Sequence, residues 1–470
     1  MGSRALLAAA ATATSMLACA VPAGAVETGV NETLGQTVPT PQKAARLGAD
    51  WVRVWALWQD LEPGRGAYNE HLIGAMGAKV AALQARGVKV LVVVHRAPAW
   101  ASGQGGIAPP NDPGRFAAFM RTMAQRLPGV DAWELWNEPD GGEFWLGGPQ
   151  PGAYAALLKA AYPAIKSVQP NDVVVTGGMV GNDMDFLQAL YDHGAQGHFD
   201  AVGVHTDTAC LTNGPDVHYR DERGRIGRYT FSAYREVHAV MSARGDGAKP
   251  IWMTEMGWNT QSTRPRSCNT GSWAGQKPIG VSQKRQARLL RAAYRCLAAD
   301  PFVGVAMWFG MQDIPGAPHA RGYGLYRAGG KAKPSAKAFR RLDRGIRPRR
   351  RCGGVVDRTP PTLRVKAPAD GRRFADKLWV RVRAFDNPGG AGIGRIFLSH
   401  NGEHVRSWGG SGGSIAPWWE SEDWRPGKHT LTFRVRDHAF NETTVTVTVE
   451  KLRRGSRRGR ALQESLRPVD

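Results

Sequence analysis

The chain has 470 residues, of which 42% are hydrophobic and 9% aromatic, and its formal net charge is +22. This length exceeds one ordinary domain, so we expect a large domain with a small companion. The apolar content supports a sizeable core and excludes a globally disordered chain.

The first residues have the pattern of an export signal. Residues 1–25 carry one cation, Arg4, then an Ala-rich apolar run and the small residues Ala23-Gly24-Ala25, which suit a cleavage site. We therefore expect a secreted protein, with lipid anchoring through Cys19 as the alternative. No later segment approaches the roughly 20 apolar residues that a membrane-spanning helix needs, so no transmembrane segment is predicted.

Removal of the signal leaves an even number of cysteines, for which disulfides are the default in an oxidising compartment. They are Cys210, Cys268, Cys296 and Cys352. Cys210 and Cys268 each follow a predicted strand and could meet on one face, which would leave Cys296 and Cys352 to join the last helices. Metal binding is the alternative, but no Cys-x-x-Cys or histidine cluster supports it, so no metal or cofactor is predicted.

The positive charge gathers partly in residues 340–351 and 451–460. A basic balance favours anionic partners. For an exported protein these would be acidic polysaccharide, cell-wall polymer or lipid headgroups, and no nucleic-acid-binding motif is present. A solvated basic surface without a partner is the alternative.

From about residue 29 to residue 345, short apolar runs alternate with longer amphipathic stretches, which is typical of strand–helix units around a parallel sheet. Eight strands are expected, at residues 29–34, 51–58, 88–95, 132–138, 173–178, 201–205, 251–255 and 303–309. The clearest helices are expected at residues 71–85, 115–126, 153–167 and 282–298. Eight units predict an α/β fold, a closed (β/α)8 TIM barrel over residues 26–350. An open doubly wound sheet is the alternative, although no Gly-rich phosphate loop follows an early strand.

The composition changes after Arg351, and Pro360-Pro361 marks a linker. Alternating apolar and polar residues then predict strands that bury one face, near residues 378–384, 431–435 and 445–449. Asn401-Gly402 predicts a hairpin turn. We expect a small all-β sandwich over residues 357–450, followed by a basic disordered tail at 451–470.

Two glutamates stand at predicted strand ends. Glu138 closes the fourth strand in Trp136-Asn137-Glu138-Pro139, where the proline cannot continue a strand ladder and biases Glu138 toward an extended conformation. Glu255 closes the seventh strand. Because the C-terminal strand ends of a barrel converge, both carboxylates should face one site. Paired carboxylates are the groups that perform glycoside hydrolysis. A surface turn that merely contains an acid is the alternative.

The runs Trp136-Asn137-Glu138-Pro139 and Thr254-Glu255-Met256-Gly257-Trp258 resemble the paired motifs of clan A glycoside hydrolases, which are retaining barrel enzymes of the family 5 or family 39 type. The resemblance implies a carbohydrate substrate, with Glu138 as acid/base, Glu255 as nucleophile and Asn137 beside the sugar hydroxyl next to the reacting carbon. The bonds cleaved would be O-glycosidic and β-linked, in a poly- or oligosaccharide. Two alternatives stay open: activity on α-L-arabinofuranosides, or a non-catalytic cell-wall-binding protein.

The same resemblance implies further substrate-binding residues. They are Arg53, His95, His205, Trp308, Trp58 and Trp100. Arg53 could keep the nucleophile ionised or pair with Glu134, an acid within a strand. Asp207 stands where many clan members carry a tyrosine that contacts the nucleophile, so His205 or Tyr219 could make that contact. Tryptophans near strand ends could stack on sugar rings or pack the loops.

The second domain resembles bacterial immunoglobulin-like modules through Thr359-Pro360-Pro361, Asp386 and residues 437–441. Such modules act as spacers or as carbohydrate and surface binders. Four tryptophans of this domain could form a sugar platform or pack its core: Trp408, Trp418, Trp419 and Trp424. We expect the whole chain to be a monomer.

Overall fold

The structure is a computed structural model. It describes residues 26–32, 40–206, 214–215, 217–218, 220–221, 223–260, 281–314, 322–349, 352, 355–387, 393–409, 414–415, 418–420, 423–437 and 441–453. Four features of the sequence lie outside these ranges: the predicted signal at 1–25, the predicted pair Cys210 and Cys268, and the candidate contact residue Tyr219.

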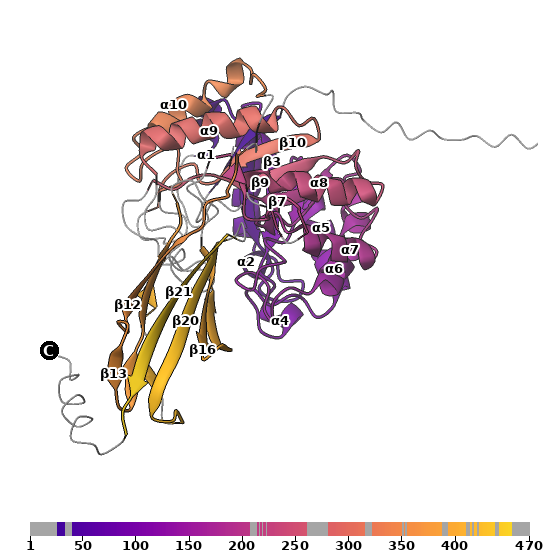
Figure 1. The fold of residues 1–470 in the computed structure, drawn as a ribbon. Helices are drawn as coiled ribbons and strands as arrows, with labels where there is room; N and C mark the ends of the chain where they lie inside the picture. Colours follow the sequence, from indigo (N-terminus) through magenta and orange to yellow (C-terminus); the bar gives the residue numbers. More distant parts are fainter. Residues whose placement is uncertain are drawn as a thin grey trace, which may run out of the picture.

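The first part of the chain contains a parallel sheet with strands in the order β5-β4-β3-β2-β1-β10-β9-β7-β6. Its strands β3, β7, β9 and β10 are labelled among the helices in Figure 1. Its strands are β1 (Glu27–Asn31), β2 (Trp51–Leu57), β3 (Lys89–His95), β4 (Ala132–Leu135), β5 (Val173–Thr176), β6 (Met179–Val180), β7 (Val202–His205), β9 (Ile251–Met256) and β10 (Val303–Trp308). A bridge between Val175 of β5 and Ala201 beside β7 brings the ends of the sheet together. With β5 and β6 taken as one strand interrupted at Gly177 and Gly178, this curled sheet fits the predicted TIM barrel.

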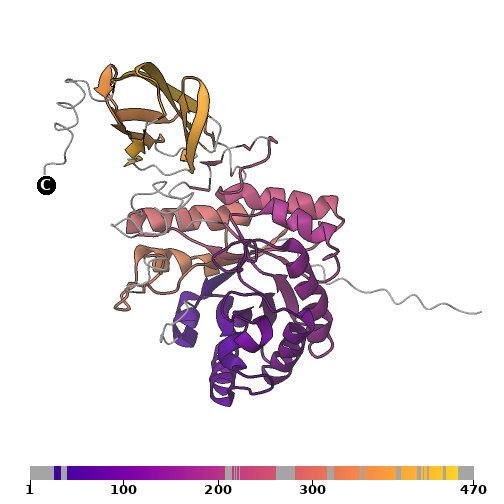
Figure 2. The same ribbon diagram turned by 90° about the horizontal axis from the view of Figure 1, so that it is seen from below.

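Helices connect the strands and lie outside the curled sheet (Figure 2). They are α1 (Thr40–Leu47), α2 (Trp58–Leu61), α3 (Glu70–Gln84), α4 (Ala99–Ser102), α5 (Pro113–Arg126), α6 (Pro151–Lys166), α7 (Met184–Asp192), α8 (Tyr234–Ala243), α9 (Gln283–Leu297) and α10 (Pro334–Phe339). Side-chain caps begin several of them: Asn69 accepts a hydrogen bond from the Leu72 amide, and Ser282 from the Arg285 amide. None of the helices within the described ranges is long and apolar enough to cross a membrane.

Two of the predicted strands extend three residues beyond the observed C-terminal ends, and the others differ by one or two residues. The first runs over Glu27–Asn31 rather than 29–34. The fourth ends at Leu135, three residues before Glu138, because the chain leaves the extended conformation at Trp136, whose φ is 76°. The Trp136 amide still donates to the Val94 carbonyl at 2.9 Å, so the segment that follows stays anchored to β3.

The predicted pairing of Cys296 with Cys352 is confirmed. These cysteines form a disulfide that ties α9 to the chain just before the second part begins. Nearby, β11 (Val355–Val356) pairs in parallel with β8 (Val217–His218).

The second part is all-β and has its own buried core. Its strands are β12 (Thr362–Ala367), β13 (Arg372–Phe374), β14 (Lys377–Trp379), β15 (Arg381–Phe385), β16 (Ile393–His400), β17 (Glu403–Gly409), β18 (Ser414–Ile415), β19 (Trp418–Glu420), β20 (Gly427–Asp437) and β21 (Glu442–Lys451). They form sheets ordered β12-β15-β18, β13-β21-β20-β16-β17 and β14-β19. The predicted turn at Asn401 and Gly402 joins β16 to β17, with both residues at positive φ. Strand β21 includes Lys451, so the predicted tail begins one residue too early.

Candidate active site

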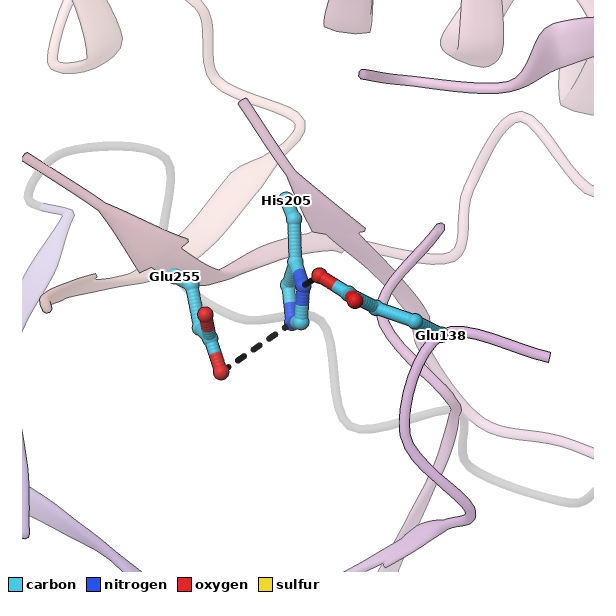
Figure 3. Close-up of side chains that lie close together, drawn as sticks. All are labelled: Glu138, His205 and Glu255. Carbon is cyan, nitrogen blue, oxygen red and sulfur yellow. Dashed lines mark hydrogen bonds and ion pairs between the residues drawn. The ribbon is translucent and has the colours of Figure 1, made fainter. Parts of the chain in front are cut away.

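Three side chains converge at one end of the barrel, from β7, from β9 and from the loop after β4 (Figure 3). His205 is the last residue of β7 and pairs in register with Glu255 of β9. Glu138 reaches the same place from the loop after β4. His205 Nδ1 lies 2.7 Å from Glu138 Oε1, and His205 Nε2 lies 3.7 Å from Glu255 Oε1. The imidazole therefore stands between the two carboxylates.

Arg53 of β2 is fully buried and contacts Glu255 of this site. Its Nη1 donates to Glu255 Oε1 at 2.6 Å and to Asn31 Oδ1 at 3.0 Å. Its Nε donates to Glu134 Oε2 at 2.6 Å, and its Nη2 donates to Glu134 Oε1 and to Asn137 Oδ1. A guanidinium has five N–H donors, and all five are used here. Arg53 thus pairs with Glu134 and with Glu255 at the same time.

Glu134 compensates Arg53 inside the barrel and joins several strands. Besides the guanidinium, its Oε1 accepts from the Gly178 amide at 2.9 Å and from Thr254 Oγ1 at 3.3 Å. Gly178 has to be glycine, because a Cβ there would lie 2.2 Å from His205 Nε2. The interruption between β5 and β6 therefore makes room for the imidazole.

Glu138 is not extended, contrary to the expectation drawn from Pro139. Its φ is 46°, in the left-handed region that non-glycine residues seldom adopt. A turn holds this conformation, since the Gly141 amide donates to the Glu138 carbonyl at 3.0 Å and the Trp145 amide donates to the Gly141 carbonyl at 2.9 Å. Backbone strain of this kind gathers at functional sites, where the surrounding structure imposes it.

Burial and neighbouring charges shift the pKa values of the site residues in opposite directions. Burial raises the pKa of Glu255, although His205 and Arg53 both act to lower it. Burial alone would lower the pKa of Arg53, but Glu134 and Glu255 raise it, so the guanidinium stays charged. One ligand atom from each of Glu138, His205 and Glu255 lies within 4.8 Å of the others, a spacing that could hold a metal. We assign no metal to it, because Arg53 already supplies the cation that Glu255 binds.

Asn137 and His95 flank the paired carboxylates. Because Arg53 Nη2 can only donate, it fixes the amide of Asn137 with Oδ1 inward and leaves the Nδ2 group as the donor for a ligand. His95, the last residue of β3, packs against Trp136 and Phe144 with ring centroids 4.8 and 5.6 Å away. Burial, with Arg96 and Arg53, lowers the pKa of His95 to about 3, so its ring is neutral.

The tryptophans predicted to bind substrate differ in exposure. Trp58 and Trp308 have no exposed surface, which corrects the expectation that their faces stack on sugar. Trp58 stacks on Phe119 in the core, and Trp308 donates from Nε1 to the Tyr323 carbonyl at 2.9 Å. Trp100 is half-buried and lies edge-on to Trp58.

Sequence reasoning missed a second buried cluster beside the loop that carries Glu138. Asp140, two residues further on, accepts from the Val180 amide and lies 3.6 Å from Arg228, which also pairs with Asp183. Arg228 further donates to the Val180 carbonyl at 2.7 Å. The cluster ties the loop after β4 to β6. Asp140 in Glu138-Pro139-Asp140 could have indicated this cluster from the sequence, because an acid so close to a strand end needs a cationic or hydrogen-bonding partner.

Comparisons with known proteins agree with a glycoside hydrolase barrel. The family model described as Cellulase (glycosyl hydrolase family 5) matches residues 25–281. A family 39 glycoside hydrolase from the gut symbiont Bacteroides cellulosilyticus is similar in structure, with 19% identity, 84% of this chain and 79% of that chain covered, and a TM-score of 0.55. A glucosidase from Croceicoccus marinus is 15% identical, with 85% of this chain and 93% of that chain covered and a TM-score of 0.50. At these identities the structural neighbours show the fold alone. The search of the curated proteins found no match.

The barrel and the family match define a glycosidase. The chain belongs to the cellulase family, glycosyl hydrolase family 5, whose model covers more than half of its length.

Proposed function

We propose that the protein is an exported retaining glycoside hydrolase that cleaves β-linked O-glycosidic bonds in a poly- or oligosaccharide. Glu138 serves as acid/base and Glu255 as nucleophile. The spacing of the two carboxylates carries this proposal, since one oxygen of Glu138 lies within 4.8 Å of one oxygen of Glu255. Retaining enzymes hold their carboxyl groups about 5–5.5 Å apart, whereas inverting enzymes leave about 6.5–9.5 Å for a water molecule. The spacing favours retention.

The reaction takes two steps. The Glu138 carboxyl gives its proton to the glycosidic oxygen while the Glu255 carboxylate attacks the anomeric carbon, so that the leaving alcohol departs and a glycosyl ester forms on Glu255. Water then attacks the same carbon, Glu138 takes the proton of that water, and the Glu255 carboxylate is released. The Glu138 and Glu255 side chains are mostly buried, with 18% and 16% of their surface exposed, and this exposed part is accessible to a substrate.

His205 suits both steps. With its proton on Nδ1, the imidazole can donate to Glu138 Oε1 in both steps, which leaves Oε2 to carry the proton that goes to the glycosidic oxygen and later comes from water. Arg53 stabilises the ionised form of Glu255 through the 2.6 Å bond, and the Asn137 amide is placed to donate to a sugar hydroxyl. The resemblance of the motifs to clan A enzymes supports the same division of roles.

We propose further that the chain divides into a catalytic domain at 26–350 and an immunoglobulin-like sandwich at 357–450. Separate buried cores support the division. Export is supported by the disulfide between Cys296 and Cys352, because such bonds persist in oxidising compartments, and by the signal-like pattern at 1–25. The net charge of +22 supports an anionic carbohydrate partner outside the cell.

The experiment compares Glu255→Ala with Glu138→Ala on an activated aryl β-glycoside. Glu255→Ala should abolish turnover, and azide should restore some of it with an inverted product. Glu138→Ala should still form the glycosyl-enzyme and then stall, and azide should release a product of retained configuration. On substrates with poor leaving groups, loss of the acid should cost about 10²- to 10⁴-fold in rate. Product configuration is measured by NMR.

Glu143→Ala serves as the matched control, because Glu143 is exposed in the same loop as Glu138. It should leave the rate within about twofold, as surface substitutions usually do. Full activity of Glu255→Ala, or the same product configuration from both azide reactions, would contradict the proposed roles.

A further inference from the structure

The all-β part of the chain presents a row of cations and aromatic rings on one face. Along β14 and β15, buried residues alternate with outward-facing ones over the run from Leu378 to Phe385. The outward side chains of this run are Trp379, Arg381, Arg383 and Phe385. Strand β12 pairs with β15 and adds Arg364 and Lys366, both exposed, with Arg364 directly opposite Arg383. We name these six residues the cationic face.

Acidic residues are missing from the outward positions of these three strands, which lie wholly within the described ranges. Arg364, Lys366 and Arg381 have no carboxylate within 4.0 Å among the described residues. The first acid after β15 in the sequence is Asp386, and it lies beside Asp357 and Asp437. The positive charges of Arg364, Lys366 and Arg381 are therefore not paired with a carboxylate among the described residues.

The aromatic rings stand out among the described apolar side chains. Trp379 and Phe385 are 41% and 44% exposed, and few other large apolar residues exceed one third. Arg381 lies over the Trp379 ring at 5.9 Å, so a cation and an aromatic surface are presented together. From Trp379 to Phe385 the row extends roughly 20 Å at the usual rise of a strand.

We propose that the cationic face binds an extended acidic polysaccharide that carries carboxylates. Guanidinium groups bind carboxylates through paired hydrogen bonds, and aromatic faces pack on the apolar faces of sugar rings. A row of both groups suits a linear chain. The choice of carbohydrate as the class of partner rests on the proposed function. The face itself is separate from the site at Glu138 and Glu255.

The test measures binding of the full-length protein to immobilised polygalacturonate at about 0.1 M salt, where charges beyond about 10 Å are screened. The triple variant Arg364→Gln, Arg381→Gln, Arg383→Gln should weaken binding at least about tenfold. A control triple, Arg406→Gln, Arg425→Gln, Lys428→Gln, removes the same charge from exposed positions outside the cationic face. It should change the affinity by less than about threefold.

Further variants and other anionic ligands identify the class of partner. Trp379→Ala should weaken binding to polygalacturonate about tenfold and leave binding to polyglutamate, which has no sugar rings, unchanged. Phe385→Ala checks the same effect at a second ring. Equal losses from both triple variants would overturn the proposal, as would equal affinity for polyglutamate, anionic vesicles or DNA. Turnover of a neutral aryl β-glycoside, measured on every variant, reports the proposed function independently of this binding, and the thermal unfolding transition of each variant reports whether its all-β part is folded.

Discussion

At the scale of single residues, Arg53 determines how the site is held. It donates to Glu134, Glu255, Asn31 and Asn137, which come from three segments of the chain: β1, β4 with the residues after it, and β9. Glu134 and Arg53 have no exposed surface. Breaking a buried pair leaves an uncompensated charge, which costs far more than breaking a pair in water.

Arg53→Met should therefore lower the free energy of unfolding by about 3–5 kcal/mol and lower kcat/KM sharply, because Glu134 loses its partner and Glu255 its cation. The matched control is Arg126→Met. Arg126 pairs with Glu70 at 2.6 Å but both are partly exposed, so the loss should stay below about 1 kcal/mol. Denaturant unfolding and steady-state kinetics measure both effects. Similar losses for the two variants would show that burial is not what makes Arg53 important.

The raised pKa of Glu255 predicts how activity depends on pH. A nucleophile must be ionised, so activity is present above its pKa in the folded protein and is lost as pH falls through it. The acidic limb of kcat/KM should therefore lie above pH 4.5, the ordinary value for this side chain. Since His205 acts to lower this pKa, His205→Asn should move the limb upward.

His71→Asn is the control for this measurement, because His71 is exposed on α3. Its pH profile should match that of the unaltered protein. An acidic limb at or below pH 4.5, or a downward shift in His205→Asn, would contradict the prediction.

At the scale of elements, the end of β4 and the interruption between β5 and β6 shape the site together. A Cβ on Gly177 would lie 2.7 Å from the Trp136 carbonyl oxygen, so the two segments approach closely. Tyr154 of α6 joins them, since its hydroxyl donates to the Leu135 carbonyl and accepts from the Gly177 amide. The left-handed conformation of Glu138 is thus supported from β5 and from α6.

The disulfide between α9 and residue 352 links elements that are 56 residues apart in sequence. The double variant Cys296→Ala, Cys352→Ala should lower the stability of the barrel by about 2–4 kcal/mol, because the unfolded chain gains conformational freedom. Tryptophan fluorescence during denaturation measures the loss. A further loss when this variant is treated with reductant would support the predicted pairing of Cys210 with Cys268. Unchanged stability of the double variant would show that the bond contributes little.

At the scale of the whole molecule, the two parts of the chain have separate buried cores. The larger cluster extends from Val26 to Cys352, and that of the all-β part extends from Leu363 to Val449. Both proposed catalytic residues belong to the first part. Burial of apolar surface, the main source of stability, is thus supplied within each part.

A chain that ends at residue 356 should consequently keep its activity on a neutral aryl β-glycoside within about threefold, because it retains one complete core and the disulfide. It should lose binding to polygalacturonate. Kinetics and binding are measured on the same preparation. Failure of the shortened chain to fold would contradict the independence of the two cores.

The sequence by itself predicted the order of strands and helices, the two glutamates near strand ends and the β-rich second part. It could do so because periodic burial and strand termination are local patterns, read within a few residues. The pairing of Cys296 with Cys352 was one of three that the sequence allowed, and the structure decides it. The predicted helix bounds differ from the observed ones by at most two residues.

Only the tertiary structure decided which groups meet. The extended conformation predicted for Glu138 was wrong because contacts from other segments outweigh the local influence of Pro139. Trp58 and Trp308 are buried and do not face a substrate. His205 lies 2.7 Å from Glu138 but 3.7 Å from Glu255. The side chains of the site come from strands that are far apart in sequence. Which of them bond to each other depends on where the barrel brings these strands together. That information is absent from any local stretch of sequence.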